Sequence, residues 1–140
     1  KTRLYKIKRY LEKHGAKKIF LPDQKHSVAY LESQRKFVHP YGIFSADVVF
    51  VPLEDGDRAG ALVKSGKQVI TVDLNPLSRT ARTATVTIVD NIVRALPVMI
   101  KTILAYKNTD KTMLAQLIKK YDNKSTLRFA LNHISHHFHH

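Results

Sequence analysis

Two short β-branched runs, separated by a polar loop, limit what this chain can fold into more than any other feature. Val69 to Val72 form the first run, which stops at Asp73, and Ala84 to Val89 form the second, which stops at Asp90. Runs of this length, bounded by Pro, Asn and Asp, are typical of strands in a buried sheet. Ligands of open α/β sheets bind just beyond the carboxyl ends of the strands. The sequence therefore predicts a binding site beside these two aspartates.

A third apolar run and the segment after it indicate that the sheet is parallel. Ala46–Val51, with the sequence ADVVFV, predicts a central strand that is covered on both faces. An acidic turn at Glu54–Asp57 follows, and Ala59–Val63 predicts a short helix that Gly66 closes. A strand–helix–strand spacing of this kind calls for a right-handed crossover. We expect an α/β fold with a Rossmann-like, mainly parallel sheet, flanking helices and a helical C-terminus.

The regions outside this unit predict further elements. The apolar spacing of Leu4, Ile7 and Leu11 predicts a basic amphipathic helix that ends at Gly15. Ala16–Leu21 then predicts a strand, and Pro22–His39 predicts a loop with one helical turn. Basic residues of this loop could face an anionic ligand, although solvated loop charges are the favoured interpretation; they are Lys25, Arg35, Lys36 and His39.

Three helices are expected after the second strand. The first is Asn91–Tyr106, in which Pro97 could cause a kink. The other two surround Met113–Ile118 and Leu127–Ile134, and they should pack on the sheet edge or on a second subunit. The first helix should turn five apolar residues toward the sheet, namely Ile92, Ala95, Leu96, Met99 and Ile103.

Composition narrows the class of protein. A length of 140 residues suits one domain, residues 1–140, with a proper core. No apolar run approaches the ~20 residues that span a bilayer, and the chain has no cysteine, so we expect a cytoplasmic protein without disulfides. The net charge of +13 favours polyanionic partners, either nucleic acid or phosphorylated small molecules. For the basic N-terminal run, a solvated surface is an equal alternative.

Side chains and helix ends would have to hold a nucleotide, because the sequence contains no Gly-rich phosphate loop. Ser78-Arg79-Thr80 could begin a short helix with free amides facing an anion, and Arg79 could bind phosphate through two nitrogens. Arg82, one turn on, could reinforce it or point to solvent. Asp73 and Asn75 suit ribose hydroxyls or a base edge. The alternative is that Asp73 and Ser78 only cap local structure.

Carboxylates at the strand ends are candidate metal ligands. Asp90, followed by Asn91, could coordinate Mg²⁺, which usually takes one or two carboxylates plus substrate phosphates, or it could cap the helix at Ile92. Arg94 could reach the same anion. The Glu54–Asp57 cluster could bind a metal or an ammonium group, or be purely structural. Arg58 beside it is a candidate to hold a carboxylate or phosphate.

The histidine-rich tail suggests metal binding at first sight. His133 and His137 are four residues apart on an expected helix, which makes a feasible chelating pair. They have no carboxylate or cysteine partner nearby, and they lie with His136, His139 and His140 at a chain end. We therefore expect only adventitious metal affinity there.

Two long motifs resemble one family. YGIFSADVVFVPLEDGDRAGALVKSGK from Tyr41 to Lys67, together with VDLNPLSRTARTATVTIVDN, resembles the archaeal phosphopantothenate synthetases, also called 4-phosphopantoate–β-alanine ligases. The match runs from about Lys6 to Val98. The resemblance implies an ATP- and Mg²⁺-dependent ligase of coenzyme A biosynthesis, a homodimer that forms an acyl-adenylate from 4-phosphopantoate and then joins it to β-alanine. It implies ATP contacts at Asp73, Leu74, Asn75, Ser78, Arg79, Thr80, Asp90 and Asn91, with Asp90 toward the metal.

One departure from the family bears on activity. Family members carry a substantial segment upstream that holds part of the active site, so the chain is expected to be the C-terminal, ATP-binding portion and not to complete the ligation alone. The rival hypothesis is a non-enzymatic nucleotide- or nucleic-acid-binding module that uses the basic N-terminal helix. No nucleic-acid-binding motif supports that rival.

Overall fold

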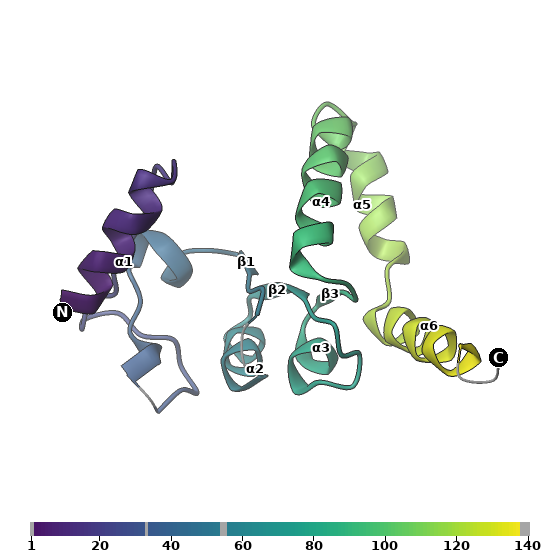
Figure 1. Cartoon of the computed structure of the whole chain (residues 1–140), viewed down its shortest axis with the longest axis horizontal. Coiled ribbons are helices and arrows are strands. Elements are labelled where there is room, and N and C mark those ends of the chain that lie inside the picture. The colour runs from purple at the N-terminus through teal and green to yellow at the C-terminus, as the bar shows by residue number, and fades with distance from the viewer. Residues whose placement is uncertain (1, 33, 54–55, 138–140) are drawn as a thin grey trace.

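A parallel β-sheet lies at the centre of the computed structural model, which describes residues 2–32, 34–53 and 56–137 (Figure 1). Within those ranges the sheet has three strands in the order β1-β2-β3: β1 (Val48–Phe50), β2 (Gln68–Val72) and β3 (Val86–Ile88). Both pairings are parallel, with Val49 opposite Val69 and Val72 opposite Ile88. The predicted α/β class and the two strands that lead to Asp73 and Asp90 are confirmed.

The central strand is β2, so the prediction of a central strand at Ala46–Val51 is wrong. β1 is an edge strand in which Val49 is buried while Val48 is 53% exposed. Val48 and Phe50, which alternate with the buried valines of this run, therefore lack a covering layer although both are apolar. Both faces of β2 have better cover, because Val69, Thr71 and Val72 are all buried.

Helix α2 (Gly56–Lys64) connects β1 to β2, as the strand–helix–strand spacing predicts. Its buried face consists of Ala59, Ala61 and Leu62. The helix closes at Gly66, whose φ of 80° lies in the left-handed region that glycine accepts without strain. The short helix α3 (Arg79–Thr83) then fills the loop between β2 and β3.

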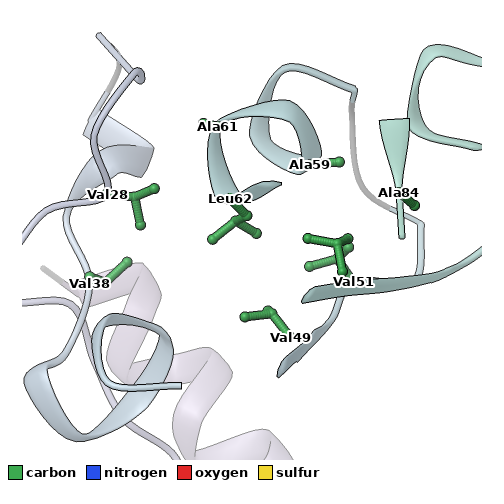
Figure 2. Packing of buried hydrophobic residues seen from close by; sticks show 9 residues of the cluster. Val28, Val38, Val49, Val51, Ala59, Ala61, Leu62 and Ala84 are labelled. Carbon is green, nitrogen blue, oxygen red and sulfur yellow. The ribbon is translucent and has the colours of Figure 1, made fainter. Parts of the chain in front are cut away.

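The hydrophobic core extends beyond the sheet to the segment predicted as a loop. Val28 and Val38 of that segment are buried, and they join Leu62 of α2 and Val49 of β1 in one cluster (Figure 2). The two valines lie close together because Val28 N donates to Lys36 O at 2.9 Å and Val38 N donates to His26 O at 3.0 Å. The predicted helical turn is present as η1 (Gln34–Lys36), and a second turn, η2 (Pro40–Phe44), leads toward β1.

The strand predicted at Ala16–Leu21 is wrong. After α1 (Thr2–Lys13) and the turn at Gly15, the chain is extended but forms no strand pairing in the described part of the molecule. Phe20 is 47% exposed, and its ring stacks on His39 with the centroids 4.5 Å apart. Phe20 is thus held by ring stacking and not by the backbone hydrogen bonds of a strand.

Helix α6 (Asn123–His136) packs on the β3 edge of the sheet, which confirms one of the two predicted positions. Leu127 is buried there, and Asn123 Nδ2 donates to the carbonyls of Ala81 and Ala84 at 2.9 and 3.0 Å. The Tyr121 hydroxyl accepts from Thr87 N at 3.1 Å. These bonds attach the C-terminal helix to both α3 and β3.

Helices α4 (Ile92–Tyr106) and α5 (Lys111–Lys120) stand away from the sheet (Figure 1). Ala95 of α4 is buried as predicted and Ile92 and Met99 are half-buried, but Leu96 and Ile103 are 40% and 62% exposed, so their predicted positions toward the sheet are wrong. A helix of this length measures about 22 Å, whereas a three-residue strand measures about 10 Å. The helix therefore extends past the sheet. Among the described residues, no helix has the length and apolar character to cross a membrane.

The core position of Leu62 allows a stability prediction. Its side chain is fully buried between α2, β1 and the loop valines, so Leu62→Ala should lower the free energy of unfolding by about 2–5 kcal/mol. Urea denaturation followed by circular dichroism measures the change. Leu77→Ala is the control, since Leu77 is 60% exposed and should alter stability by no more than about 0.5 kcal/mol. Equal losses in the two variants would contradict this description of the core.

Candidate functional site

A crevice of about 230 Å³ opens at the carboxyl ends of β2 and β3, where the sequence predicts a site. Four of the eight predicted site residues line it: Asp73, Leu74, Asp90 and Asn91. Leu53, which follows β1, and Ile92, the first residue of α4, complete its walls together with Thr71 and Val72.

The two aspartates are fixed by the same backbone carbonyl. Asp73 N donates to Ile88 O at 3.0 Å as the last rung between β2 and β3, and Asp90 N donates to the same oxygen at 3.1 Å in a tight turn. The parallel pairing of β2 and β3 therefore fixes the backbone positions of both aspartates. Their mutual placement depends on the sheet and not on a mobile loop.

Asp73 organises the loop that leads to α3. Its Oδ1 accepts from Asn75 N at 2.9 Å, and its Oδ2 accepts from the Ser78 hydroxyl at 2.5 Å. The Ser78 Oγ in turn accepts from Ala81 N at 2.9 Å and so caps α3. Asp73 and Ser78 thus have the capping roles that were given above as the alternative to ligand binding. Asn75 and Ser78 do not line the crevice, but both are hydrogen-bonded to Asp73, which does.

Asp90 is paired with Arg94, one turn into α4. Its Oδ1 accepts from Arg94 Nε at 2.8 Å and from Asn91 N at 2.6 Å. The hydrogen bond from Arg94, followed by that from Asn91, lowers the pKa of the Asp90 carboxyl below its usual 3.8. Asp90 therefore adds stability above that value, and this contribution is lost as pH falls through its depressed pKa. The cap of α4 is Asn91, whose Oδ1 accepts from Val93 N at 2.9 Å, and not Asp90.

The oxygen atoms that line the crevice could coordinate a hard cation that also binds a phosphate. Two carboxylates and the Asn91 amide lie beside the first turn of α4, whose free amides favour anions. No group of three or more His, Asp or Glu side chains in the described ranges could enclose a metal on its own. A magnesium ion here would therefore need further ligands from outside these side chains, such as water or a bound phosphate.

Arg79 and Thr80 do not line the crevice. Arg79 forms an ion pair with Asp57 in the first turn of α2, where both side chains are about 70% exposed. The pair borders a separate hollow of about 550 Å³, which Arg35 and Lys64 also line. Thr80 is buried in α3, at 4% exposure. The predicted site is thus divided between two neighbouring depressions.

Gly56 lies against Arg79, a contact that the sequence did not predict. A Cβ atom placed there would lie 2.5–2.6 Å from the Cβ, Cγ and Cδ atoms of Arg79, so a side chain at this position would displace the arginine. In the sequence, the only sign of this close contact was a glycine within the acidic turn at Glu54–Asp57. Helix α2 begins at Gly56, three residues before the predicted range Ala59–Val63. Glu54 and Asp55 of the acidic cluster lie outside the described residues.

Leu53 is a second residue that the sequence did not indicate. Its φ of 58° is unusual for a leucine, and its side chain is 80% exposed at the edge of the crevice. Strained backbone of this kind is common at binding sites. The sequence PLE around this residue carries no signal of that conformation.

The histidine-rich tail forms no metal centre in the part of the chain that the structure describes. The rings of His133 and His137 lie 4.6 Å apart, and His137 Nδ1 lies 3.0 Å from the His133 carbonyl oxygen. His139 and His140 lie outside the described residues.

Comparison with known proteins agrees with the resemblance of the motifs. The family model described as phosphopantothenate/pantothenate synthetase matches residues 1–137. A 4-phosphopantoate–β-alanine ligase of Methanosarcina mazei is 48% identical over 136 residues, which cover 97% of this chain and 53% of that protein. The ligase of the same name from Thermococcus kodakarensis is 55% identical over 104 residues, 74% of this chain and 40% of the relative. The chain thus spans about half the length, or less, of the curated relatives it matches.

Proposed function

Because this chain belongs to the phosphopantothenate/pantothenate synthetase family, we propose that it supplies the ATP-binding part of a ligase that joins 4-phosphopantoate to β-alanine. The names of its relatives give the two substrates. The observation that carries the proposal is the crevice at the ends of β2 and β3, where Asp73, Asp90 and Asn91 meet the first turn of α4. The product would be 4′-phosphopantothenate, an intermediate of coenzyme A biosynthesis.

The nucleotide would bind partly inside and partly outside the crevice. Its volume of about 230 Å³ is below the ~300–1,000 Å³ of typical ligand pockets, so it would hold one end of ATP. Asp73 and Asn75 offer oxygens to ribose hydroxyls. Asp90, with Asn91 beside it, would hold Mg²⁺, which would neutralise charge on the phosphates.

Arg79 remains the candidate ligand for the outer phosphates, although it pairs with Asp57. An exposed ion pair contributes only about 0–1 kcal/mol, and this pair is exposed on both sides. A hydrogen bond between a guanidinium and a phosphate contributes about 1.5–3 kcal/mol. A phosphate can therefore compete with Asp57 for the arginine, and Gly56 leaves the space in which the side chain turns.

The proposed reaction has two steps. A carboxylate oxygen of 4-phosphopantoate attacks the α-phosphorus of ATP, a new P–O bond forms, and pyrophosphate leaves with the electrons of the broken bond. The amine of β-alanine then attacks the activated carbonyl, the C–O bond to AMP breaks, and the amine loses a proton as the amide forms. The protein would contribute by alignment and by stabilising charge at phosphorus; none of the residues described at the site is an evident base for the amine.

Arg79→Ala should weaken ATP binding about tenfold or more, because one charge-assisted phosphate contact is lost. Isothermal titration calorimetry with ATP and Mg²⁺ measures the dissociation constant. Asp57→Asn is the matched control: it removes the ion pair but keeps the guanidinium, so the affinity should stay the same or rise. Equal weakening in both variants would mean that Arg79 acts through its pair with Asp57 and not on the nucleotide.

The ligation assay tests the reaction itself. The complete Methanosarcina mazei ligase, supplied with ATP, Mg²⁺, 4-phosphopantoate and β-alanine, should release AMP and pyrophosphate. The 140-residue chain should bind ATP but turn over far more slowly, since alignment of two reactants can contribute ~7–11 kcal/mol and about half of the relative lies outside the match. Release of ADP and phosphate would contradict the adenylate route, and equal turnover would contradict a divided active site.

The proposed assembly is a homodimer that covers α4. Val98 and Leu104 of this helix are 64% and 65% exposed, more than expected for apolar residues of a helix packed on its own chain. Val98→Glu should therefore shift the chain toward the monomer in sedimentation-velocity experiments. Lys119→Gln on α5, which also lowers the net charge by one at an exposed position, should leave the sedimentation coefficient unchanged. A monomeric unmodified chain would rule out this assembly.

A further inference from the structure

The two outer edges of the sheet differ in how their backbone groups are bonded. At the β3 edge, Thr87 N donates to the Tyr121 hydroxyl at 3.1 Å, so a side chain from the segment between α5 and α6 covers this edge. An uncovered strand edge presents unpaired amides and carbonyls to any other chain, and folded proteins usually cover or charge such an edge. The β3 edge of this sheet is covered in that way.

The β1 edge is open. Gln68 N donates to Asp47 O at 2.8 Å, and Val51 N donates to Ile70 O at 2.9 Å, so alternate residues of this segment bond to β2. In a parallel pair the residues between them turn their amides and carbonyls to the other side, which places those of Val48 and Phe50 on the outer edge. No described residue forms a hydrogen bond with these outward groups.

The side chains of the same two residues are also uncovered. Val49 and Val51 are buried in the cluster that contains Leu62 of α2 (Figure 2), whereas Val48 is 53% and Phe50 39% exposed on the opposite face. Parallel sheets occur almost only with both faces covered. The strand contains no charged residue and no proline that would protect its edge. Both the edge and this face of β1 therefore have the character of a contact surface.

The length of the relatives indicates which polypeptide covers β1. The match covers 53% of the Methanosarcina mazei ligase and 40% of the Thermococcus kodakarensis ligase, so about half of each relative, or more, lies outside it. A second copy of the chain suits this surface less well. Two β1 edges related by a twofold axis contribute the same residues to each other, so their pairing would extend the sheet but leave the exposed face of both strands bare.

We propose that the open edge of β1 is the docking site for a strand from the part of the family's ligases that lies outside the match, and that a helix or loop of the same part covers Val48 and Phe50. Backbone hydrogen bonds to the outward groups supply affinity in such strand addition, and burial of the two apolar side chains adds to it. Leu53, which follows β1, lines the crevice, so the added strand would also support one wall of the proposed nucleotide site.

Hydrogen exchange followed residue by residue by NMR spectroscopy tests the edge. The inference rests on family membership and not on nucleotide binding, so no ATP or substrate is added. In the 140-residue chain, the amides of Val48 and Phe50 should exchange at least about tenfold faster than that of Val49, which bonds to β2. In the complete Methanosarcina mazei ligase, the matching amides should exchange as slowly as that of the residue between them.

Two results of this measurement would overturn the proposal. One is fast exchange of the matching amides in the complete ligase, because it would show that the edge stays open there. The other is slow exchange of the Val48 and Phe50 amides in the 140-residue chain alone. If that protection increases with protein concentration, a second copy of the chain covers the edge.

A lysine substitution tests the covered face. Val48→Lys should leave the urea midpoint of the 140-residue chain unchanged, because this side chain is already 53% exposed. The same change at the matching position of the complete ligase should lower the midpoint, because it places a charge in a buried layer. Leu77→Lys is the matched control: Leu77 is 60% exposed and lies outside β1, so the change should leave both midpoints unaltered. An unaltered midpoint of the complete ligase with lysine at the Val48 position would contradict the covering layer.

Discussion

The pairing of β2 with β3 is the constraint on which the site depends. The last rung of this pair, from Asp73 N to Ile88 O, lies where both strands stop, and the Asp90 amide returns to the same carbonyl. One acceptor thus holds the two acidic positions at one edge of the sheet. A shift of the register by one residue would turn every side chain of β3 to the opposite face and would separate the two aspartates.

Different parts of the molecule contribute to stability and to binding. Burial of Leu62, Val69 and the valines around them supplies the hydrophobic driving force. The Arg79–Asp57 pair is about 70% exposed on both sides, and in the Arg94–Asp90 pair the arginine is 69% and the aspartate 34% exposed. Pairs with this much solvent contact contribute little to folding. Because little stability is lost when these pairs open, their charged groups can exchange partners when an anion or a metal ion arrives.

The sequence was most informative where the pattern was local. Short β-branched runs ending in Asp identified β2 and β3, and the cap and stop residues identified α2 and α4. It was misleading where the outcome depended on neighbouring segments. Five of the six residues in ADVVFV are apolar, yet β1 exposes Val48 and Phe50. Ala16–Leu21 has apolar residues but no partner strand in the described chain. The crevice followed from strand ends. The pairing of Asp57 with Arg79 and the hollow that Arg35 and Lys64 line could not be predicted, because they join segments whose separation in sequence carries no signal.

The close approach of Gly56 to Arg79 links the two motifs by which the family is recognised. The first motif contains β1 and α2, and the second contains α3. They meet at Gly56, which has no side chain and therefore lets Arg79 lie against the start of α2. Substitutions in the two motifs are therefore not independent: a larger residue at the first position changes where the guanidinium of the second can reach. Transferring either motif alone into another protein would reproduce its sequence but not its geometry, so the two motifs form one structural unit.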